Sequence, residues 1–188
     1  MPEPGPPAYV LAGGRSSRMG RDKAFVEIEG VAMALRVARA LRGGGAGAVH
    51  LVGKDPALAS LGLPWVPDRD PLHHPLVGAA AALRHAQLLG ARTAVLCPCD
   101  LPWLEADAVR ALLAHAGPAC LGDGDRVQPL CCQLPVERAV AMSQAAVQGA
   151  SVRVTLADLL VVRVDARALR NVNQPGDLPS APQSPGSV

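Results

Sequence analysis

A glycine-rich segment near the N-terminus has the composition of a phosphate-binding loop. Residues 11–23 read Leu-Ala-Gly-Gly-Arg-Ser-Ser-Arg-Met-Gly-Arg-Asp-Lys and follow an apolar run. Glycine adopts positive φ at little cost, so several backbone N–H groups can turn toward one anion. The spacing matches neither the P-loop nor the dinucleotide-binding fingerprint, and the alternative is a turn with solvated arginines. We favour phosphate binding, because the glycines coincide with four cations: Arg15, Arg18, Arg21 and Lys23.

The last cation of this loop is unusual for this chain. The chain has 16 arginines, and its only lysines are Lys23 and Lys54. A lysine inside a glycine-rich loop therefore stands out from the general use of arginine. We expect Lys23 to contact a phosphate group.

A second candidate for chemistry is the carboxylate of Asp100, in the run Leu-Cys-Pro-Cys-Asp-Leu-Pro at residues 96–102. A single carboxylate after an apolar strand suits Mg²⁺, which takes one or two protein carboxylates together with substrate phosphates. The alternative is an Asp that caps the helix that follows. Taken alone the two interpretations are balanced, and the phosphate loop upstream favours the metal site.

The elements that must position these motifs alternate between apolar strand-like runs and amphipathic stretches. This alternation predicts a single-domain α/β fold: a mostly parallel, twisted sheet with helices on both faces. In such sheets ligands bind at the carboxyl ends of the strands, where both motifs fall. We expect strands at residues 9–12, 48–52, 65–66, 93–97, 130–134 and 160–164, and helices at 31–42, 77–89, 106–115 and 136–147.

The composition sets the boundaries and excludes several classes of function. Proline, serine and glycine at residues 1–7 and 179–188 predict a disordered lead and a disordered tail around one domain at 8–178. Hydrophobic residues make up 49% of the chain, aromatic residues only 2%, and the net charge is +2. Few stacking platforms and little positive charge argue against nucleic-acid binding. The chain has no export signal and no apolar run near the ~18 residues of a membrane span, so we expect a cytoplasmic protein without a membrane partner. We also expect a monomer.

Cysteine and histidine offer weaker candidates for metal binding. The five cysteines stand at 97, 99, 120, 131 and 132, and neither Cys-Pro-Cys nor Cys-Cys matches a zinc or redox motif. We expect buried, reduced thiols in strands rather than a four-thiol metal site. His73 and His74 could serve a metal or act as a base, but no partner spacing is visible, so surface-loop histidines are the favoured interpretation.

These motifs together resemble the signatures of the molybdenum cofactor guanylyltransferases, the MobA family. The pattern Gly-Gly-x-Ser-x-Arg-Met-Gly-x-Asp-Lys at 13–23 is similar to the nucleotide loop of the family, and Pro-Cys-Asp-Leu-Pro at 98–102 to its metal-binding segment. Gln-Pro-Leu at 128–130 and Asn-Val-Asn-Gln-Pro-Gly-Asp-Leu at 171–178 resemble its two C-terminal signatures. The Gly-Gly and Asp-Lys pairs favour this family over related cytidylyltransferases, whose loops tend to read Ala-Gly.

The resemblance implies a Rossmann-like nucleotidyltransferase fold of the nucleotide-diphospho-sugar transferase type, and a role for individual residues. Asp68 would contact the nucleotide, and Asp100 would bind both GTP and Mg²⁺, with Mn²⁺ as an alternative metal. Arg18, Lys23 and Asp100 would carry catalysis. The remaining GTP contacts implied by the family are Leu11, Ala12, Gly13 and Gly14, and the pterin-substrate contacts are Arg153, Asn171 and Asn173.

The chain departs from the family pattern at a few positions. Val52 stands where the family often has Asn, so one contact to the base is missing or replaced. His74 replaces the first glycine of a Gly-Pro-Leu-Ala-Gly segment and could alter the mouth of the base pocket. Gln174 and Gly176 replace a Thr and a Glu on either side of Pro175. None of these changes touches the phosphate loop or Asp100.

The reaction implied by the resemblance is transfer of GMP from GTP to molybdenum-molybdopterin, which yields the guanine dinucleotide cofactor and pyrophosphate. Molybdenum cofactor biosynthesis or acceptor proteins would be the protein partners. An Asp68 carboxylate, which offers only acceptors, would suit the N1–H and N2 donors of guanine. Two alternatives stay open: a cytidylyl- or sugar-nucleotide transferase with the same loop, and a non-catalytic relative that binds the pterin.

Overall fold

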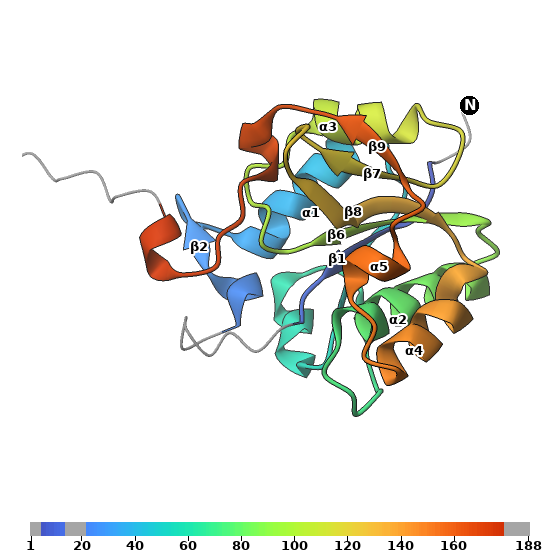
Figure 1. Ribbon diagram of the computed structural model, residues 1–188. Helices are drawn as coiled ribbons and strands as arrows, with labels where there is room; N and C mark the ends of the chain where they lie inside the picture. Colours follow the sequence, from blue (N-terminus) through green and yellow to red (C-terminus); the bar gives the residue numbers. More distant parts are fainter. Residues whose placement is uncertain (1–4, 14–21, 179–188) are drawn as a thin grey trace, which may run out of the picture.

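The computed structural model describes residues 5–13 and 22–178, and a seven-stranded sheet forms its centre (Figure 1). The strands of this sheet are β1 (Ala8–Leu11), β4 (Val49–Gly53), β5 (Trp65–Pro67), β6 (Thr93–Pro98), β7 (Ala119–Gly122), β8 (Val127–Pro135) and β9 (Leu160–Arg163). They lie in the order β5-β4-β1-β6-β8-β7-β9. All neighbours are parallel except β8, which is antiparallel to both β6 and β7. The predicted mostly parallel α/β sheet is confirmed.

Helices cover both faces of the sheet (Figure 1). On one face, α1 (Met33–Gly43) and α3 (Ala106–Leu113) pack against each other and share a core with the sheet. On the other face, α2 (Pro75–Leu88) packs against α4 (Arg138–Val147) over a second core. Among the described residues, no helix has the length and apolar character needed to cross a membrane.

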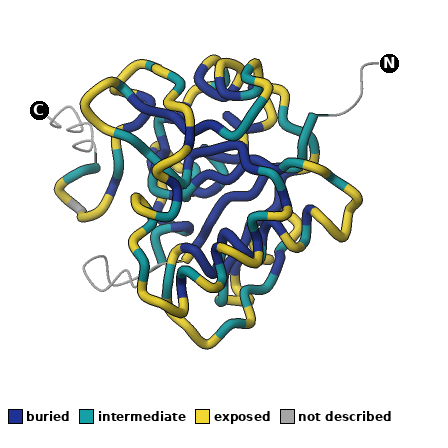
Figure 2. The backbone as a smooth tube through the Cα atoms, turned by 45° about the vertical axis from the view of Figure 1, so that its right-hand side comes forward, coloured by how far each residue is buried: buried dark blue, intermediate teal, exposed yellow. Residues whose placement is uncertain are grey.

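The central strand β1 shows why the sheet needs both layers. Its four residues are all buried, and successive side chains of a strand point to opposite faces. Ala8 and Val10 belong to the core under α1 and α3, and Tyr9 and Leu11 to the core over α2 and α4. A continuous apolar run is typical of such a doubly covered parallel strand. Figure 2 shows the buried backbone concentrated in this sheet.

Short elements fill the connections near the carboxyl ends of the strands. The hairpin of β2 (Glu27–Ile28) and β3 (Val31–Ala32) turns at Glu29 and Gly30, which both have positive φ, as a two-residue type I′ turn requires. The other short elements are η1 (Lys23–Phe25), η2 (Pro56–Leu61), α5 (Val152–Thr155), η3 (Ala166–Leu169) and η4 (Pro175–Asp177).

The structure differs from the sequence predictions at a few elements. Residues 31–32, expected at the start of a helix, form β3, and α1 begins at Met33. Strand β7 was not predicted, and β8 extends several residues beyond the expected 130–134.

The N-terminal boundary also differs from the prediction. Residues 5–7, expected in the disordered lead, lie against the domain instead. The carbonyls of Pro6 and Pro7 accept hydrogen bonds from the N–H groups of Gly47 (2.9 Å) and Val95 (3.0 Å). A side chain at Gly5 would collide with the carbonyl of Gly45. Residues 1–4 and the predicted tail at 179–188 lie outside the described residues.

Candidate active site

A cavity of about 570 Å³ opens at the carboxyl ends of β5, β4, β1 and β6. This is the edge at which parallel sheets bind ligands. Its described lining comes from the last residues of these strands and the segments that follow them, from β8 and from the start of α2. The lining residues are Leu11, Ala12, Gly13, Asp22, Val52, Gly53, Lys54, Asp55, Asp68, His73, His74, Pro75, Gly78, Pro98, Asp100 and Leu130.

The backbone after β1 is fixed between its two neighbouring strands. The Ala12 N–H donates to the carbonyl of Val52 (2.7 Å), and the carbonyl of Leu11 accepts from the Cys99 N–H (3.1 Å). A side chain at Gly53 would collide with the carbonyl of Ala12, so the close approach of these segments requires glycine there. Leu11, Ala12 and Gly13, predicted to contact GTP, lie in the wall of the cavity, and these contacts hold their backbone in place there.

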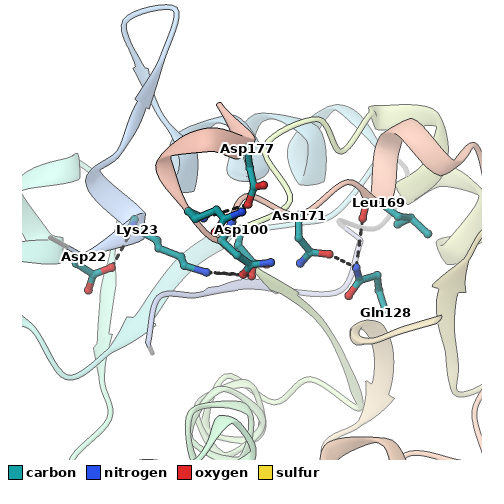
Figure 3. Close-up of polar contacts among 10 residues, drawn as sticks. Asp22, Lys23, Asp100, Gln128, Leu169, Asn171 and Asp177 are labelled. Atoms are coloured by element: carbon teal, nitrogen blue, oxygen red, sulfur yellow. Dashed lines mark hydrogen bonds and ion pairs between the residues drawn. The ribbon is translucent and has the colours of Figure 1, made fainter. Parts of the chain in front are cut away.

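Lys23 and Asp100 lie together, as the two motifs predicted (Figure 3). Lys23 begins η1, whose N-cap is Asp22; the Asp22 side chain accepts from the Ala24 N–H at 2.9 Å. The Lys23 ammonium lies 3.7 Å from Oδ2 of Asp100 and donates a hydrogen bond to Oδ1 of Asn173 at 2.6 Å. The glycine-loop lysine, the carboxylate after β6 and the C-terminal segment thus meet at one point.

The second oxygen of Asp100 gives the site its fit to a metal ion. Oδ1 of Asp100 is buried and has no hydrogen-bond partner among the described residues. A buried carboxylate oxygen without a partner is costly, and a divalent cation would satisfy it. The described residues contain no group of three or more His, Cys, Asp or Glu side chains that could hold a metal ion. Mg²⁺ suits a single carboxylate, because it takes its other ligands from water and substrate phosphates.

The C-terminal segment is held by its own capping network. Its Val172 N–H donates to the carbonyl of Asp100 (2.9 Å). The Asp177 carboxylate accepts from the N–H groups of Asn173 (2.8 Å) and Gln174 (3.0 Å), and these two hydrogen bonds lower the pKa of Asp177. The segment is therefore ordered so that the Asn173 side chain reaches Lys23.

Asn171, also predicted to contact the pterin, is not part of the described cavity lining. Its side chain bonds instead to Gln128 of the other C-terminal signature (Figure 3). The Gln128 side-chain amide donates to Oδ1 of Asn171 and to the carbonyl of Leu169, the latter at 3.2 Å. Leu130, two residues after Gln128 on β8, lines the cavity. The segments 128–130 and 171–178, far apart in sequence, are thus neighbours beside the site.

A second charged pair lies in the cavity wall, at the ends of β4 and β5. Oδ2 of Asp68 lies 3.2 Å from the Lys54 ammonium, and Oδ1 accepts from the Asp70 N–H at 3.2 Å. Lys54 also donates to the carbonyl of Asp70. The Asp68 N–H donates to the carbonyl of Gly53 (3.0 Å), which anchors the aspartate to β4. Asp68 was a predicted site residue; Lys54 was not, although its rarity as a lysine was a usable signal.

His73 and His74 both border the cavity, although they were expected to be surface-loop histidines. His73 is exposed. His74 has a structural role: its Nδ1 accepts from the Leu76 N–H at 3.2 Å and so caps the N-terminus of α2. The expected place of His74 at the mouth of the pocket agrees with this lining, but its role as a helix cap was not predicted.

The other predicted site residues are not found in the described part of the cavity wall. Arg153 is exposed on α5 and is not part of the described lining. Gly14 and Arg18 lie outside the described residues.

The five cysteines are all buried and free. Burial raises the pKa of the Cys97, Cys99 and Cys132 thiols well above the usual range. A buried thiol with a raised pKa is a poor nucleophile. The prediction that the cysteines serve packing is in line with this burial.

Comparisons with known proteins agree with the geometry. The model of the MobA-like NTP transferase domain matches residues 8–169. A molybdenum cofactor guanylyltransferase of Xanthomonas euvesicatoria is 34% identical over 161 residues, which are 86% of this chain and 74% of that protein. A protein of the same name from Rhizobium meliloti is 45% identical over 101 residues, 52% of this chain and 46% of that protein.

A solved structure has the same fold. The crystal structure of molybdopterin-guanine dinucleotide biosynthesis protein A from Archaeoglobus fulgidus superimposes with a TM-score of 0.70 at 22% identity, and the match covers 91% of this chain and 94% of that one. The predicted nucleotidyltransferase type of fold is thereby confirmed.

Proposed function

The chain belongs to the MobA-like NTP transferase family, and we propose that it transfers GMP from GTP to molybdenum-molybdopterin and releases pyrophosphate. The observation that carries the proposal is the meeting of Lys23 with Asp100, whose buried Oδ1 has no partner among the described residues, beside a nucleotide-sized cavity. The Xanthomonas and Rhizobium relatives are named molybdenum cofactor guanylyltransferase, which supports this choice of the transferred group and of its acceptor.

In the proposed reaction, a phosphate oxygen of the pterin attacks the α-phosphorus of GTP. The bond from the α-phosphorus to the oxygen that bridges to the β-phosphate breaks, and pyrophosphate leaves. The attacking phosphate is already charged at neutral pH, so that positioning and charge neutralisation can carry the catalysis without a strong base. Arg18, which lies outside the described residues, stays predicted from the family resemblance to share in this charge neutralisation.

The residues of the site divide this work. Asp100 would hold Mg²⁺, which supplies charge neutralisation for the phosphates when it is bound. The Lys23 ammonium, next to Oδ2 of Asp100, would neutralise phosphate charge, and its hydrogen bond to Asn173 keeps it in a defined position. The backbone of Leu11, Ala12 and Gly13 bounds the nucleotide, and Asp68 accepts from the base. The pterin contacts of Arg153, Asn171 and Asn173 stay predictions, as do the cytoplasmic location and the monomeric state.

A nucleotide panel tests the proposal. GTP, CTP, UTP and ATP are each incubated with Mg²⁺ and molybdenum-molybdopterin, and pyrophosphate release is measured. We expect release with GTP that depends on both the pterin and Mg²⁺. Release with CTP or UTP in place of GTP would support the alternative nucleotidyltransferase. Absence of release with every nucleotide, in protein that binds the pterin, would support the non-catalytic alternative.

A further inference from the structure

The Lys54–Asp68 pair is the second charged centre of the cavity, and its place in the sheet separates it from the first. It follows β4 and β5, whereas Asp100 follows β6. Strand β1 lies between β4 and β6, so the two centres are about two strand spacings, or roughly 10 Å, apart. A nucleotide with its phosphates at Asp100 would place its base toward Lys54 and Asp68.

Lys54 is the only lysine or arginine among the described residues that line the cavity. Its neighbours in the wall, Val52 and Gly53, offer no polar side chain. The Lys54 side chain is 33% exposed and that of Asp68 only 8%, so the pair is partly withdrawn from water. Hydrogen bonds in such a place discriminate strongly between ligands, because a wrong ligand leaves the buried groups unpaired.

The hydrogen-bonding capacity that remains on this pair can be counted. An ammonium has three donors; one of those of Lys54 faces Asp68 and one goes to the carbonyl of Asp70, which leaves one. Each carboxylate oxygen has two acceptor positions. Oδ2 of Asp68 uses one on Lys54 and Oδ1 uses one on the Asp70 N–H, so each oxygen retains another. The pair thus offers one donor beside two acceptors.

This pattern complements one edge of guanine. The edge presents an acceptor, O6, followed by two donors, N1–H and the N2 amine. Cytosine presents a donor followed by two acceptors, uracil an acceptor, a donor and an acceptor, and adenine a donor and an acceptor. Only guanine matches one donor and two adjacent acceptors at every position.

We propose that Lys54 is a specificity-determining residue that donates to O6 of guanine while Asp68 accepts from N1–H and the N2 amine. This inference rests on the proposed use of GTP and adds to it a side chain that recognises O6 of guanine. Lys54 also neutralises Asp68, so that the carboxylate can lie in a largely buried place without an uncompensated charge.

The test compares three triphosphates that differ in the base edge. GTP has O6, N1–H and the N2 amine; ITP lacks the N2 amine; 2-aminopurine riboside triphosphate lacks O6 and N1–H. Their dissociation constants are measured for the wild type, for Lys54→Met and for the control Arg69→Met. Arg69 is exposed beside Asp68 and is not part of the described lining. Tm values establish that each variant is folded.

We expect Lys54→Met to weaken GTP and ITP equally, by about tenfold or more, the usual loss for a hydrogen bond to a charged group. Binding of the 2-aminopurine nucleotide should change by less than about twofold, since it has no O6 to lose. Arg69→Met should leave all three unchanged. If Lys54→Met is not folded, wild-type binding of 6-thio-GTP replaces it; a marked weakening relative to GTP is expected, and equal binding would overturn the proposal.

Two other outcomes would overturn the role of Lys54. Equal weakening of all three nucleotides would mean that Lys54 acts on the phosphates or on the shape of the cavity. Loss of the preference for GTP over ITP would mean that it acts only through the position of Asp68. Neither of these two outcomes would contradict the proposed function, provided that the wild type binds GTP. A wild type that binds no GTP would instead contradict the proposed function itself.

Discussion

The two lysines of this chain each lie beside an aspartate at the same cavity, and the two pairs differ in how completely they are bonded. Lys54 and Asp68 approach to 3.2 Å, and both Asp68 oxygens have partners. Lys23 and Asp100 are 3.7 Å apart; Lys23 makes its short bond to Asn173, and Oδ1 of Asp100 has none among the described residues. The Lys54–Asp68 pair, with both carboxylate oxygens bonded, is suited to recognising a fixed hydrogen-bond pattern. The Lys23–Asp100 pair, with one carboxylate oxygen still without a partner among the described residues, is suited to binding an ion and charged phosphates.

The largest effect should follow from removing the unsatisfied carboxylate. Asp100→Ala should lower turnover by roughly a hundredfold or more, the scale of losing a main electrostatic stabiliser. It should leave the Tm nearly unchanged, because loss of the ion pair with Lys23 is offset by removal of a buried oxygen whose lack of a partner is costly. Steady-state pyrophosphate release and thermal unfolding measure the two. Asp125→Ala, at an exposed hairpin position, is the control. Near-normal turnover of Asp100→Ala at saturating Mg²⁺ would contradict the assignment of Asp100 as the metal ligand.

The next effect tests the satisfied pair. Asp68→Asn replaces one acceptor by a donor and should weaken GTP binding by about 1–3 kcal/mol, the cost of an unsatisfied buried partner. The preference of GTP over ITP should fall with it. Calorimetric titration with both nucleotides gives the answer. If the wild type and the variant treat GTP and ITP alike, Asp68 does not read the base.

A smaller effect is expected from a change that keeps the charge near Asp100. Lys23→Arg replaces a compact ammonium by a planar guanidinium, which cannot hold the same short bond to Asn173. We expect kcat/KM to fall by about tenfold, equivalent to about 1.4 kcal/mol of transition-state stabilisation. The reverse exchange, Arg69→Lys, is the matched control at an exposed position. Wild-type kinetics for Lys23→Arg would mean that Lys23 is only a solvated charge.

The smallest effect concerns a cluster outside both pairs, formed by the buried Tyr9 and His50 and the half-buried His85, and it separates stability from recognition. The Tyr9 hydroxyl lies 2.9 Å from Nδ1 of His85, and the His50 ring stacks on Tyr9 with centroids 5.1 Å apart. Burial lowers the pKa of both histidines below 6.5. The unfolded chain therefore binds more protons, so stability is full above pH 6.5 and declines as the pH falls through the folded-state values.

We expect the Tm to drop by a few degrees between neutral and mildly acidic pH, and His50→Phe to reduce that drop. The ratio of GTP to ITP affinity should be the same for the wild type and His50→Phe at each pH. A pH-independent Tm in the wild type would contradict the inference that His50 and His85 are neutral in the folded protein.

The sequence was most informative where local pattern and chemistry coincide. The apolar run of β1, the glycines after it and Asp100 after β6 sufficed to predict the sheet and one edge of the site. The short β7 was missed, because its four residues stand between turn-forming prolines and glycines. The Lys54–Asp68 contact depends on the side-by-side placement of β4 and β5, and no spacing along the chain indicates it. Capping of α2 by His74 has a different origin, because it depends on the local backbone geometry at the start of the helix.

The division of labour between the two pairs can be tested in one measurement. Dissociation constants for GTP and for inorganic tripolyphosphate are compared, at saturating Mg²⁺, among the wild type, Asp68→Asn and Asp100→Ala. Asp68→Asn should weaken GTP and leave tripolyphosphate unchanged, whereas Asp100→Ala should weaken both by similar factors. If Asp68→Asn weakens tripolyphosphate as much as GTP, or if Asp100→Ala affects neither, the two pairs do not divide base and phosphate binding between them.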